Sequence, residues 1–249
     1  MNTHTTDILV IGGGPAGSTF ANLAARKGWQ ATLFEKDKHP RFHIGESLLP
    51  MTMPIIDRLD LRDELEAIGV RKHGADFTSF RAGAYSHSYP FSRALGNSPD
   101  HAFQVRRSEF DQMLFEGCKR AGVSAHEEMT VTKVEPLESG DHRVTVVDAG
   151  GQQSIWLSKF LVDASGRDTF LSGKRGWKHR NPKHASGAVF SHFRGARRRA
   201  GEREGDISIY WFEHGWVWMI PLRDDVASPL APRNDVENGD EDDKKKGEN

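Results

Sequence analysis

The sequence predicts an α/β fold built around a Rossmann-like dinucleotide-binding unit. Three observations support this prediction: an apolar strand near the start of the chain, a glycine-rich turn directly after it, and a helix and second strand that complete a βαβ unit. The first strand, residues 7–11, is almost entirely apolar, as a buried strand of a parallel sheet should be. The turn "GGGPAG" contains the pattern G-x-G-x-x-G at Gly12, Gly14 and Gly17.

Each residue of this turn has an expected task. Gly12 permits the tight turn, Gly14 lets the backbone approach a pyrophosphate, and Gly17 allows close packing of the helix. Pro15 and Ala16 start the helix, whose N-terminal partial positive charge faces the phosphates. We therefore predict that these five residues bind the diphosphate of a dinucleotide.

The helix and the second strand complete the unit. Phe20, Leu23 and Ala24 are expected on the buried face of the helix, and Gly28 is expected to end it. The second strand, residues 30–34, leads into Glu35. Glu35 follows the first glycine by about 20 residues, the spacing at which a carboxylate binds the ribose hydroxyls of the adenosine half. The acid favours a free 2′-hydroxyl, so NAD or FAD rather than NADP.

Composition narrows the functional class. The 249 residues have a formal net charge of −1, which gives no support to nucleic acid or an anionic membrane as a partner. The single cysteine, Cys118, rules out an intramolecular disulfide, favours a reducing cytoplasm, and fits an apolar helical stripe. We find no signal peptide, no apolar run of membrane-spanning length and no metal-ligand spacing among the 12 histidines, so we expect neither a membrane anchor nor a metal.

Three further segments favour FAD over a nicotinamide. "HPRFHIGESLLP" (39–50) opens no second phosphate loop, and "FQVRRSEFDQMLF" (103–115) follows farther along the chain. "FLVDASGRDTFL" (160–171) is an apolar strand that ends in an acid, placed to reach the ribityl and pyrophosphate part of a flavin. Three separate segments that address one long cofactor suit FAD better. The candidate cofactor-binding residues in and near these segments are Lys36, Arg41, Ser47, Arg106 and Asp163.

Five motifs, taken together and in order, resemble those of the flavin-dependent halogenases and their monooxygenase relatives. They are "IGGGPAGS", "PRFHIGESLLP", "FQVRRSEFD", "VDASGR" and "WVWMIP". The W-x-W-x-I-P pattern at Trp216–Pro221 is that family's own signature. The resemblance runs from about Asp7 to Leu222. It implies a nucleotide-binding domain with an inserted antiparallel β-sheet on the substrate side.

The resemblance also implies a reaction. In such enzymes reduced FAD reacts with O₂ to form a C4a-hydroperoxide, halide attacks it to give hypohalous acid, and a lysine in a tunnel holds or captures that oxidant. An electron-rich small-molecule or carrier-bound substrate is then halogenated. A separate flavin reductase supplies the reduced FAD.

Two residues are the catalytic candidates that the resemblance implies. Lys72, in "GVRKHGADF", matches the position of the family's active-site lysine, and partial burial would lower its pKa. Glu46 lies in the segment that resembles the strip against the flavin, where it would order the backbone or handle protons. The alternative for Lys72 is a solvated surface lysine. The alternative for Arg106 is an ion pair with Glu109 or Asp111.

The stretch "DISIYWFEHGWVWMIPL" predicts a hairpin with its turn at residues 213–215. Trp216 and Trp218 lie two apart on the second strand, so they share one face. They either pack in the core or form the wall on the substrate side that the family signature implies.

The predicted organisation has three parts. Residues 1–172 form the FAD-binding domain, with small β insertions at about 77–102, and residues 173–222 form part of the substrate-side sheet. Residues 223–249, densely charged and without an aromatic residue, are predicted to be a disordered tail. The basic cluster at 194–204 is expected to be a solvated loop.

No G-D-A-like turn followed by a helix comes after residue 222, so we expect the family's C-terminal half to be missing and the chain to be truncated. Other functions remain open. They are an FAD-dependent aromatic hydroxylase or monooxygenase, a prenyl-chain reductase of the same superfamily, and a non-catalytic FAD-binding remnant.

Overall fold

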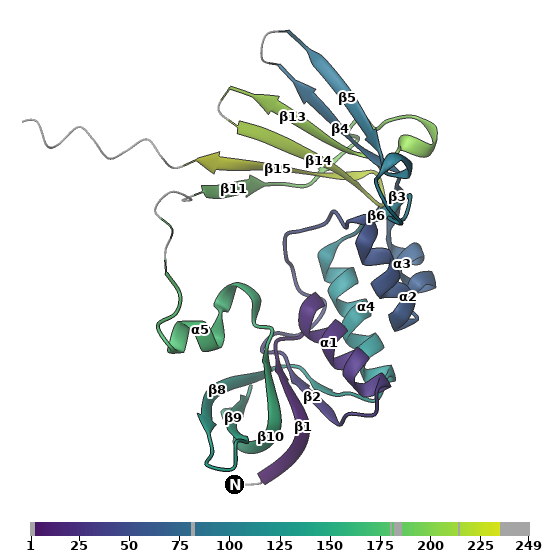
Figure 1. Cartoon of the computed structure of the whole chain (residues 1–249). Helices are drawn as coiled ribbons and strands as arrows, with labels where there is room; N and C mark the ends of the chain where they lie inside the picture. Colours follow the sequence, from purple (N-terminus) through teal and green to yellow (C-terminus); the bar gives the residue numbers. More distant parts are fainter. Residues whose placement is uncertain (1–2, 81–82, 180, 182–185, 214, 235–249) are drawn as a thin grey trace, which may run out of the picture. The chain divides into compact units, whose positions relative to one another are not determined.

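The computed structural model describes residues 3–80, 83–179, 181, 186–213 and 215–234 (Figure 1). The chain forms two units, and neither is continuous in sequence. The first unit comprises Met1–Gly45, Thr52–Ile68 and Arg106–Lys178. The second unit comprises Glu46–Met51, Gly69–Val105 and His179–Asn249.

The first unit contains a six-stranded sheet in the order β7-β2-β1-β10-β9-β8. Its first four strands are parallel, and β9 and β8 are added antiparallel at one edge. The strands are β1 (Thr3–Ile11), β2 (Ala31–Phe34), β7 (Ser124–His126), β8 (Met129–Pro136), β9 (His142–Asp148) and β10 (Gln153–Asp163). The predicted opening βαβ unit is therefore present, with both of its strands adjacent in the sheet.

Helices pack on one face of this sheet (Figure 1). Helix α1 (Pro15–Arg26) and helix α4 (Arg107–Arg120) share a core with β1 and β2, and Cys118 is buried in it. The opposite face is covered by residues of β8 and β9. The remaining helices of this unit are α2 (Met53–Leu59), α3 (Arg62–Ile68), η3 (Gly166–Asp168) and α5 (Phe170–Lys174).

The buried face of α1 differs from the prediction at one residue. Phe20 is 42% exposed, whereas Ala24 is buried as expected. The residues that face the core are small or polar: Gly17, Ser18, Ala21, Asn22 and Ala24. Small residues let the helix approach the sheet closely, which leaves no room for a phenyl ring on that side. Gly28 ends the helix with a φ of +87°, as predicted.

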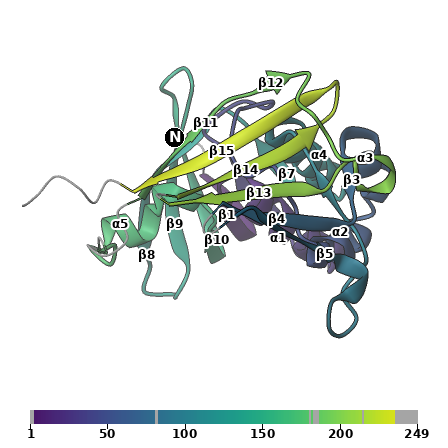
Figure 2. The same ribbon diagram turned by 90° about the horizontal axis from the view of Figure 1, so that it is seen from above.

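The second unit contains a seven-stranded sheet in the order β11-β15-β14-β13-β4-β5, with β12 paired to β15. Figure 2 shows β15, β14, β13 and β4 lying side by side. The strands are β4 (Gly74–Ser79), β5 (Tyr85–Pro90), β11 (Ser186–Phe190), β12 (Phe193–Arg194), β13 (Ile207–Phe212), β14 (Gly215–Leu222) and β15 (Val226–Asn234). A separate ladder joins β3 (Val70–Lys72) to β6 (Ala102–Gln104). Three short 3₁₀ segments are η1 (Pro50–Thr52), η2 (Phe91–Arg93) and η4 (Gly201–Arg203).

The hairpin of β13 and β14 is confirmed, and three other predictions need correction. The sheet is not purely antiparallel, because β4 and β13 pair in parallel. Residues 69–105 belong with 179–249 rather than with a domain ending at 172, because β4 and β5 are strands of the same sheet as β13.

The third correction concerns the C-terminal tail. Val226–Asn234 form strand β15, which pairs with both β14 and β11. The predicted disordered tail therefore does not begin at residue 223. The density of charge in the tail concealed the short apolar run "VASPLA", whose first residues are buried in the sheet. Residues 235–249 lie outside the described residues.

Candidate functional site

The glycine turn of the first unit has the geometry that the sequence predicted. Gly12 has a φ of +101°, and a Cβ atom there would lie 2.5 Å from the carbonyl oxygen of Ala164. A Cβ atom on Gly17 would lie 1.9 Å from the carbonyl oxygen of Gly12. Gly14 differs, because a Cβ atom there would meet only Arg41 Nη2, at 3.5 Å. The protein itself thus requires glycine at 12 and 17, while the space beside Gly14 is open.

Helix α1 begins directly at this turn. Pro15 occupies the first turn, where its missing N–H costs nothing, and Ala16 is exposed. Among the described residues, no side chain caps the helix N-terminus by a hydrogen bond. This helix end can therefore present its N–H groups and its partial positive charge to an anion.

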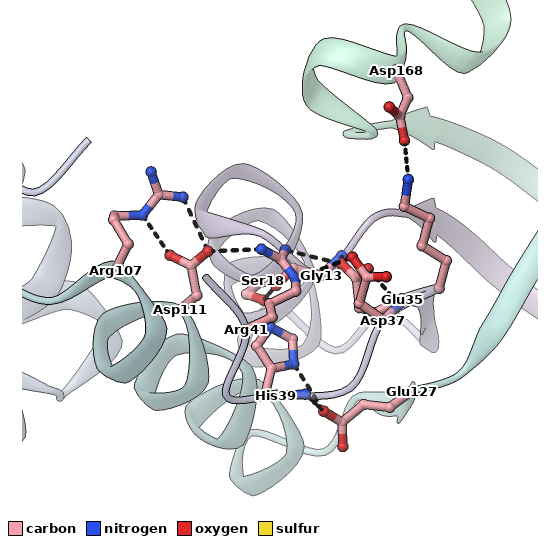
Figure 3. Close-up of polar contacts among 11 residues, drawn as sticks. Gly13, Ser18, Glu35, Asp37, His39, Arg41, Arg107, Asp111, Glu127 and Asp168 are labelled. Carbon is pink, nitrogen blue, oxygen red and sulfur yellow. Dashed lines mark hydrogen bonds and ion pairs between the residues drawn. The ribbon is translucent and has the colours of Figure 1, made fainter. Parts of the chain in front are cut away.

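Glu35 lies beneath the turn and is only 4% exposed. Its carboxylate accepts hydrogen bonds from the backbone N–H of Gly13 at 2.7 Å and of Asp37 at 2.9 Å, and from Arg41 Nη2 at 3.2 Å (Figure 3). Burial alone would raise the pKa of Glu35, but these hydrogen bonds and the positive charge of Arg41 lower it overall. Glu35 is therefore held as a carboxylate that shapes the turn. Its contact with a ribose stays a prediction.

Arg41 joins two buried acids, as Figure 3 shows. Its Nη2 lies 3.2 Å from Glu35, and its Nη1 lies 3.2 Å from Asp111, whose side chain is fully buried. Arg107 binds the same Asp111 carboxylate through Nε at 2.8 Å and Nη2 at 3.0 Å. This chain of charges fixes the Arg41 guanidinium beside Gly14, so the open side of the turn has a cation next to it.

The other predicted cofactor residues of the first unit have internal partners. Lys36 pairs with Asp168, and both side chains are more than half exposed. Arg106 precedes α4 and lies 3.6 Å from the Glu109 carboxylate, which is the ion pair expected as its alternative. Asp163 accepts hydrogen bonds from the Ser165 hydroxyl and from the Leu171 N–H, at 2.5 and 2.8 Å. Asp163 therefore builds the turn whose Ala164 packs on Gly12, and direct contact of any of the three with a cofactor stays a prediction.

Lys72 lies in the second unit, on β3, and is 1% exposed. It is not the solvated lysine of the alternative interpretation. Its Nζ donates a hydrogen bond to Ser47 Oγ at 2.5 Å. Burial lowers the pKa of the Lys72 amine to about 8, against a smaller opposing effect from the Asp206 carboxylate. Ser47, expected at the cofactor, is thus a partner of the candidate catalytic lysine.

Glu46 is buried beside Ser47 and faces a histidine. His192 Nε2 lies 3.0 Å from Glu46 Oε1 in the same unit. The backbone of this segment is tied to β6, because Val105 N–H donates to Glu46 O at 2.8 Å and Leu48 N–H donates to Phe103 O at 3.0 Å. The Glu46 segment therefore lies along the same ladder as Lys72.

The two tryptophans of the signature have different environments. Trp216 packs against the apolar cluster of Ile207, Ile209, Ile220, Leu222 and Val226, whereas Trp218 is 36% exposed. A cavity of about 490 Å³ lies elsewhere on this sheet. It is lined by Phe77, Thr78, Ser79, Tyr85, His87, Tyr89 and Trp211. Neither signature tryptophan lines this cavity, and Trp211, directly opposite Trp216 in the β-ladder, is the indole that does.

Several residues of these sites were not predicted. Asp111 and Arg107 have the i, i+4 spacing of a helical ion pair, which is the signal that could have identified them. Asp206 and His192 carry no local signal, because each contacts a residue more than 100 positions away in the sequence.

The prediction for the basic cluster at 194–204 also needs correction. Arg199 and Arg203 pair with the buried Asp76, so this loop is anchored on the sheet rather than simply solvated.

The described part of the chain lacks two kinds of feature, a metal-binding cluster and a membrane-spanning helix. No three His, Cys, Asp or Glu side chains gather as ligands of a metal ion would. No helix in those residues combines the length and apolar character needed to cross a membrane.

The glycine turn and the parallel sheet define a dinucleotide-binding α/β protein. The sequence matches the family model of the FAD binding domain over residues 5–245, so the chain belongs to the FAD-binding domain family. It is also homologous to flavin-dependent halogenases, as the motifs predicted, and the predicted α/β fold is confirmed over the N-terminal half of halogenase structures.

Three similar proteins illustrate this relation. Tryptophan 2-halogenase from Chondromyces crocatus is 35% identical over 228 residues, covering 90% of this chain and 42% of that protein. The 1H-pyrrole-2-carbonyl-(peptidyl-carrier protein) chlorinase of Pseudomonas fluorescens is 31% identical, covering 92% and 56%. The solved structure of the myxobacterial chondrochloren halogenase CndH has a TM-score of 0.82 at 32% identity, covering 93% of this chain and 53% of that one. The chain spans about half the length of the relatives that it matches.

Proposed function

We propose that this chain is an FAD-dependent oxidoreductase of the halogenase type, which uses reduced FAD, O₂ and halide to halogenate an electron-rich organic substrate. The observation that carries the proposal is Lys72, a buried amine in a chain homologous to flavin-dependent halogenases. A pKa of about 8 leaves roughly one Lys72 amine in ten neutral at pH 7, a far larger fraction than for an ordinary lysine.

The residues of the first unit fit the diphosphate and adenosine of FAD. The turn leaves the space beside Gly14 open, the helix N-terminus is uncapped by side chains of the described residues, and the Arg41 guanidinium lies next to it. We assign the diphosphate to Gly12, Gly14, Pro15, Ala16, Gly17 and Arg41. We assign the adenosine side to Glu35 and Lys36, and the flavin side to Arg106 and Asp163.

When bound, reduced FAD would supply the oxygen chemistry that oxidises halide. In the second unit, the neutral Lys72 amine would hold hypohalous acid by a hydrogen bond or react with it, and burial would protect it from water. The carboxylate of Glu46, paired with the half-exposed His192, would exchange a proton with solvent. Trp218 would form part of an apolar wall on the substrate side.

The named relatives are a tryptophan halogenase and a chlorinase of a 1H-pyrrole-2-carbonyl group on a peptidyl-carrier protein, so we propose a small-molecule or carrier-bound substrate and leave both open. A separate flavin reductase would supply reduced FAD.

Cofactor binding is tested first, by titrating the purified chain with FAD and following flavin absorbance. Gly14→Ala should weaken FAD binding at least tenfold, about 1.4 kcal/mol, while leaving the fold intact, because its Cβ has space in the protein. The matched variant Gly17→Ala should lose the folded turn itself. Wild-type protein that binds no FAD would refute the proposal.

Activity is tested with FAD, a flavin reductase, bromide or chloride, O₂ and a panel of free and carrier-bound aromatic substrates, with mass spectrometry of the products. Wild-type protein should give halogenated product and Lys72→Ala should give none, while Lys159→Ala, at an exposed lysine, should match wild type. A hydroxylated product without halogen would indicate a monooxygenase. FAD binding without any product would support a non-catalytic FAD-binding protein.

A further inference from the structure

The position of Lys72 depends on a hydroxyl group that the backbone fixes. Ser47 Oγ accepts the hydrogen bond from Lys72 Nζ at 2.5 Å, and the Ser47 backbone forms a β-bridge with Gln104 of β6. β6 pairs on its other side with β3, which carries Lys72 opposite Ala102. The two partners thus lie on opposite sides of one short ladder, and the ladder sets where the hydroxyl can be.

The chain on either side of Lys72 is fixed by a second segment, residues 205–206. Asp206, 4% exposed, accepts hydrogen bonds through Oδ1 from the N–H groups of His73 and Gly74, at 2.8 and 2.7 Å. These are the two residues directly after Lys72. Directly before it, the carbonyl oxygen of Arg71 lies so close to Gly205 that a Cβ atom there would be 2.0 Å away. Only glycine at 205 allows the Asp206 carboxylate this approach.

Asp206 also supplies the negative charge that acts on Lys72. Its carboxylate favours the ammonium form, against burial, which favours the neutral amine. That carboxylate is shared, because Arg203 Nε lies 3.3 Å from Oδ2. The Phe91 ring centroid lies 5.8 Å from Lys72 Nζ and adds a weak attraction for the ammonium. Other charged or titratable side chains on the neighbouring elements include Glu46, Arg71, His73, Arg93 and His101.

We propose that Ser47 and Asp206 are the positioning residues of Lys72: Ser47 holds the amine itself, and Asp206 holds the backbone directly after it. The proposal rests on the function proposed for Lys72. Neither residue needs to touch substrate or cofactor for this role. Sequence places them 25 and 134 residues from the lysine, and only the fold brings them together.

The test is an NMR titration of the full chain labelled with [ε-¹³C]lysine, with Lys72→Met used to assign the Lys72 signal. Asp206→Asn keeps an oxygen for the two N–H groups but removes the charge, so the pKa of Lys72 should fall by on the order of one unit. Ser47→Ala should lower it less, and Ser47→Thr should restore it. Asp7→Asn, at an acid of the first unit that pairs with Lys159, is the control and should leave the Lys72 titration unchanged.

An unchanged Lys72 titration in both Asp206→Asn and Ser47→Ala would overturn the proposal. If Asp206→Asn fails to fold, the comparison of Ser47→Ala with Ser47→Thr tests the proposal by itself. Ser47→Ala removes a single oxygen atom, so we expect it to fold. In an active preparation, the pH profile of halogenation should move by the same amount as the titration. Because the titration needs neither FAD nor substrate, shifts that occur without halogenating activity in the wild type would refute the proposed function alone.

Discussion

Glu35 in the first unit and Lys72 in the second are both buried charged side chains, yet their surroundings have opposite consequences. Glu35 receives two backbone N–H groups and an arginine, and its pKa is lowered, which keeps it charged. Lys72 has one hydroxyl acceptor and a carboxylate shared with Arg203, and its pKa is also lowered, which for an amine favours the neutral form.

This difference in the number of partners distinguishes a charge that stabilises the fold from one that can react. A buried charge with enough partners stabilises its surroundings and has little tendency to change its protonation. A buried charge with too few partners has a perturbed pKa in the range where it can exchange a proton or act as a nucleophile. By this criterion Glu35 stabilises the glycine turn, and Lys72 is the better candidate for chemistry.

The largest expected effect is a difference in stability between variants that lack the Glu35 charge and variants that lack the Lys72 charge. Glu35→Ala should lower the free energy of unfolding by about 3–5 kcal/mol, because it leaves Arg41 and the Gly13 N–H buried without their acceptor. Lys72→Met removes an undercompensated charge and keeps the volume, so stability should change by less than about 1 kcal/mol or increase. Urea unfolding of both variants at neutral pH measures the contrast.

Equal losses of stability in Glu35→Ala and Lys72→Met would contradict the distinction between the two charges. Glu35→Gln is the informative intermediate. It keeps one acceptor oxygen but not the charge, so its loss should lie between zero and that of Glu35→Ala.

The second expected effect is a difference in pH dependence. The pKa of Lys72 is about 8 in the folded protein and about 10.5 when unfolded, so the unfolded state binds more protons between these values and stability rises with pH across that window. The gain relative to Lys72→Met should approach about 3 kcal/mol by the top of the window. The pKa of Glu35 is lowered, so its contribution is present above about 4.5 and is lost as pH falls below that value.

Both expected pH dependences, that of Lys72 and that of Glu35, can be tested in one series. The series measures the free energy of unfolding of wild type, Lys72→Met and Glu35→Gln from acid to alkaline pH. The wild type should diverge from Lys72→Met only on the alkaline side. Its difference from Glu35→Gln should grow as pH rises from the acid side to about 4.5 and stay constant above that value. A difference between wild type and Lys72→Met that stays constant from pH 7 upward would mean that Lys72 has an ordinary pKa.

The first unit was largely predictable from sequence because its signals are local. The opening strand, the glycine turn, the helix and Glu35 fall within one short stretch, and each residue type has a steric or electrostatic reason to be there. The hairpin of β13 and β14 was predictable for the same reason. One prediction in this stretch was wrong: Phe20 was expected to be buried, but it is exposed. The side of α1 that packs on the sheet carries small residues, and a phenyl ring does not fit there.

The surroundings of Lys72 were not predictable from sequence, because they arise from long-range pairing. The position of Lys72 came from a family resemblance, and its partners Ser47 and Asp206 come from separate strands and turns. The assignment of 69–105 to the wrong domain has the same origin, since a short polar strand such as β5 gives no signal of the strand that it joins.

The smallest expected effect is that of removing an exposed charge close to the buried Glu35, which separates the effect of burial from that of charge. Lys36 directly follows Glu35 in the chain and also has an ionic partner, Asp168, but both members of that pair are more than half exposed. Lys36→Ala should therefore change the free energy of unfolding by at most about 0.5 kcal/mol, and added salt should remove the difference, because water and ions screen an exposed pair. Urea unfolding at low and high salt measures it.

The same variant also distinguishes the two roles assigned to Lys36. If Lys36 contacts FAD, Lys36→Ala should weaken FAD binding, whereas Lys159→Ala, which breaks another exposed pair of the same unit, should not. A loss of stability in Lys36→Ala as large as that in Glu35→Ala would show that proximity to the turn, rather than burial, determines the energetic weight of a charge in this region. A small loss of stability with weaker FAD binding would instead identify Lys36 as a ligand-binding residue that contributes little to the fold.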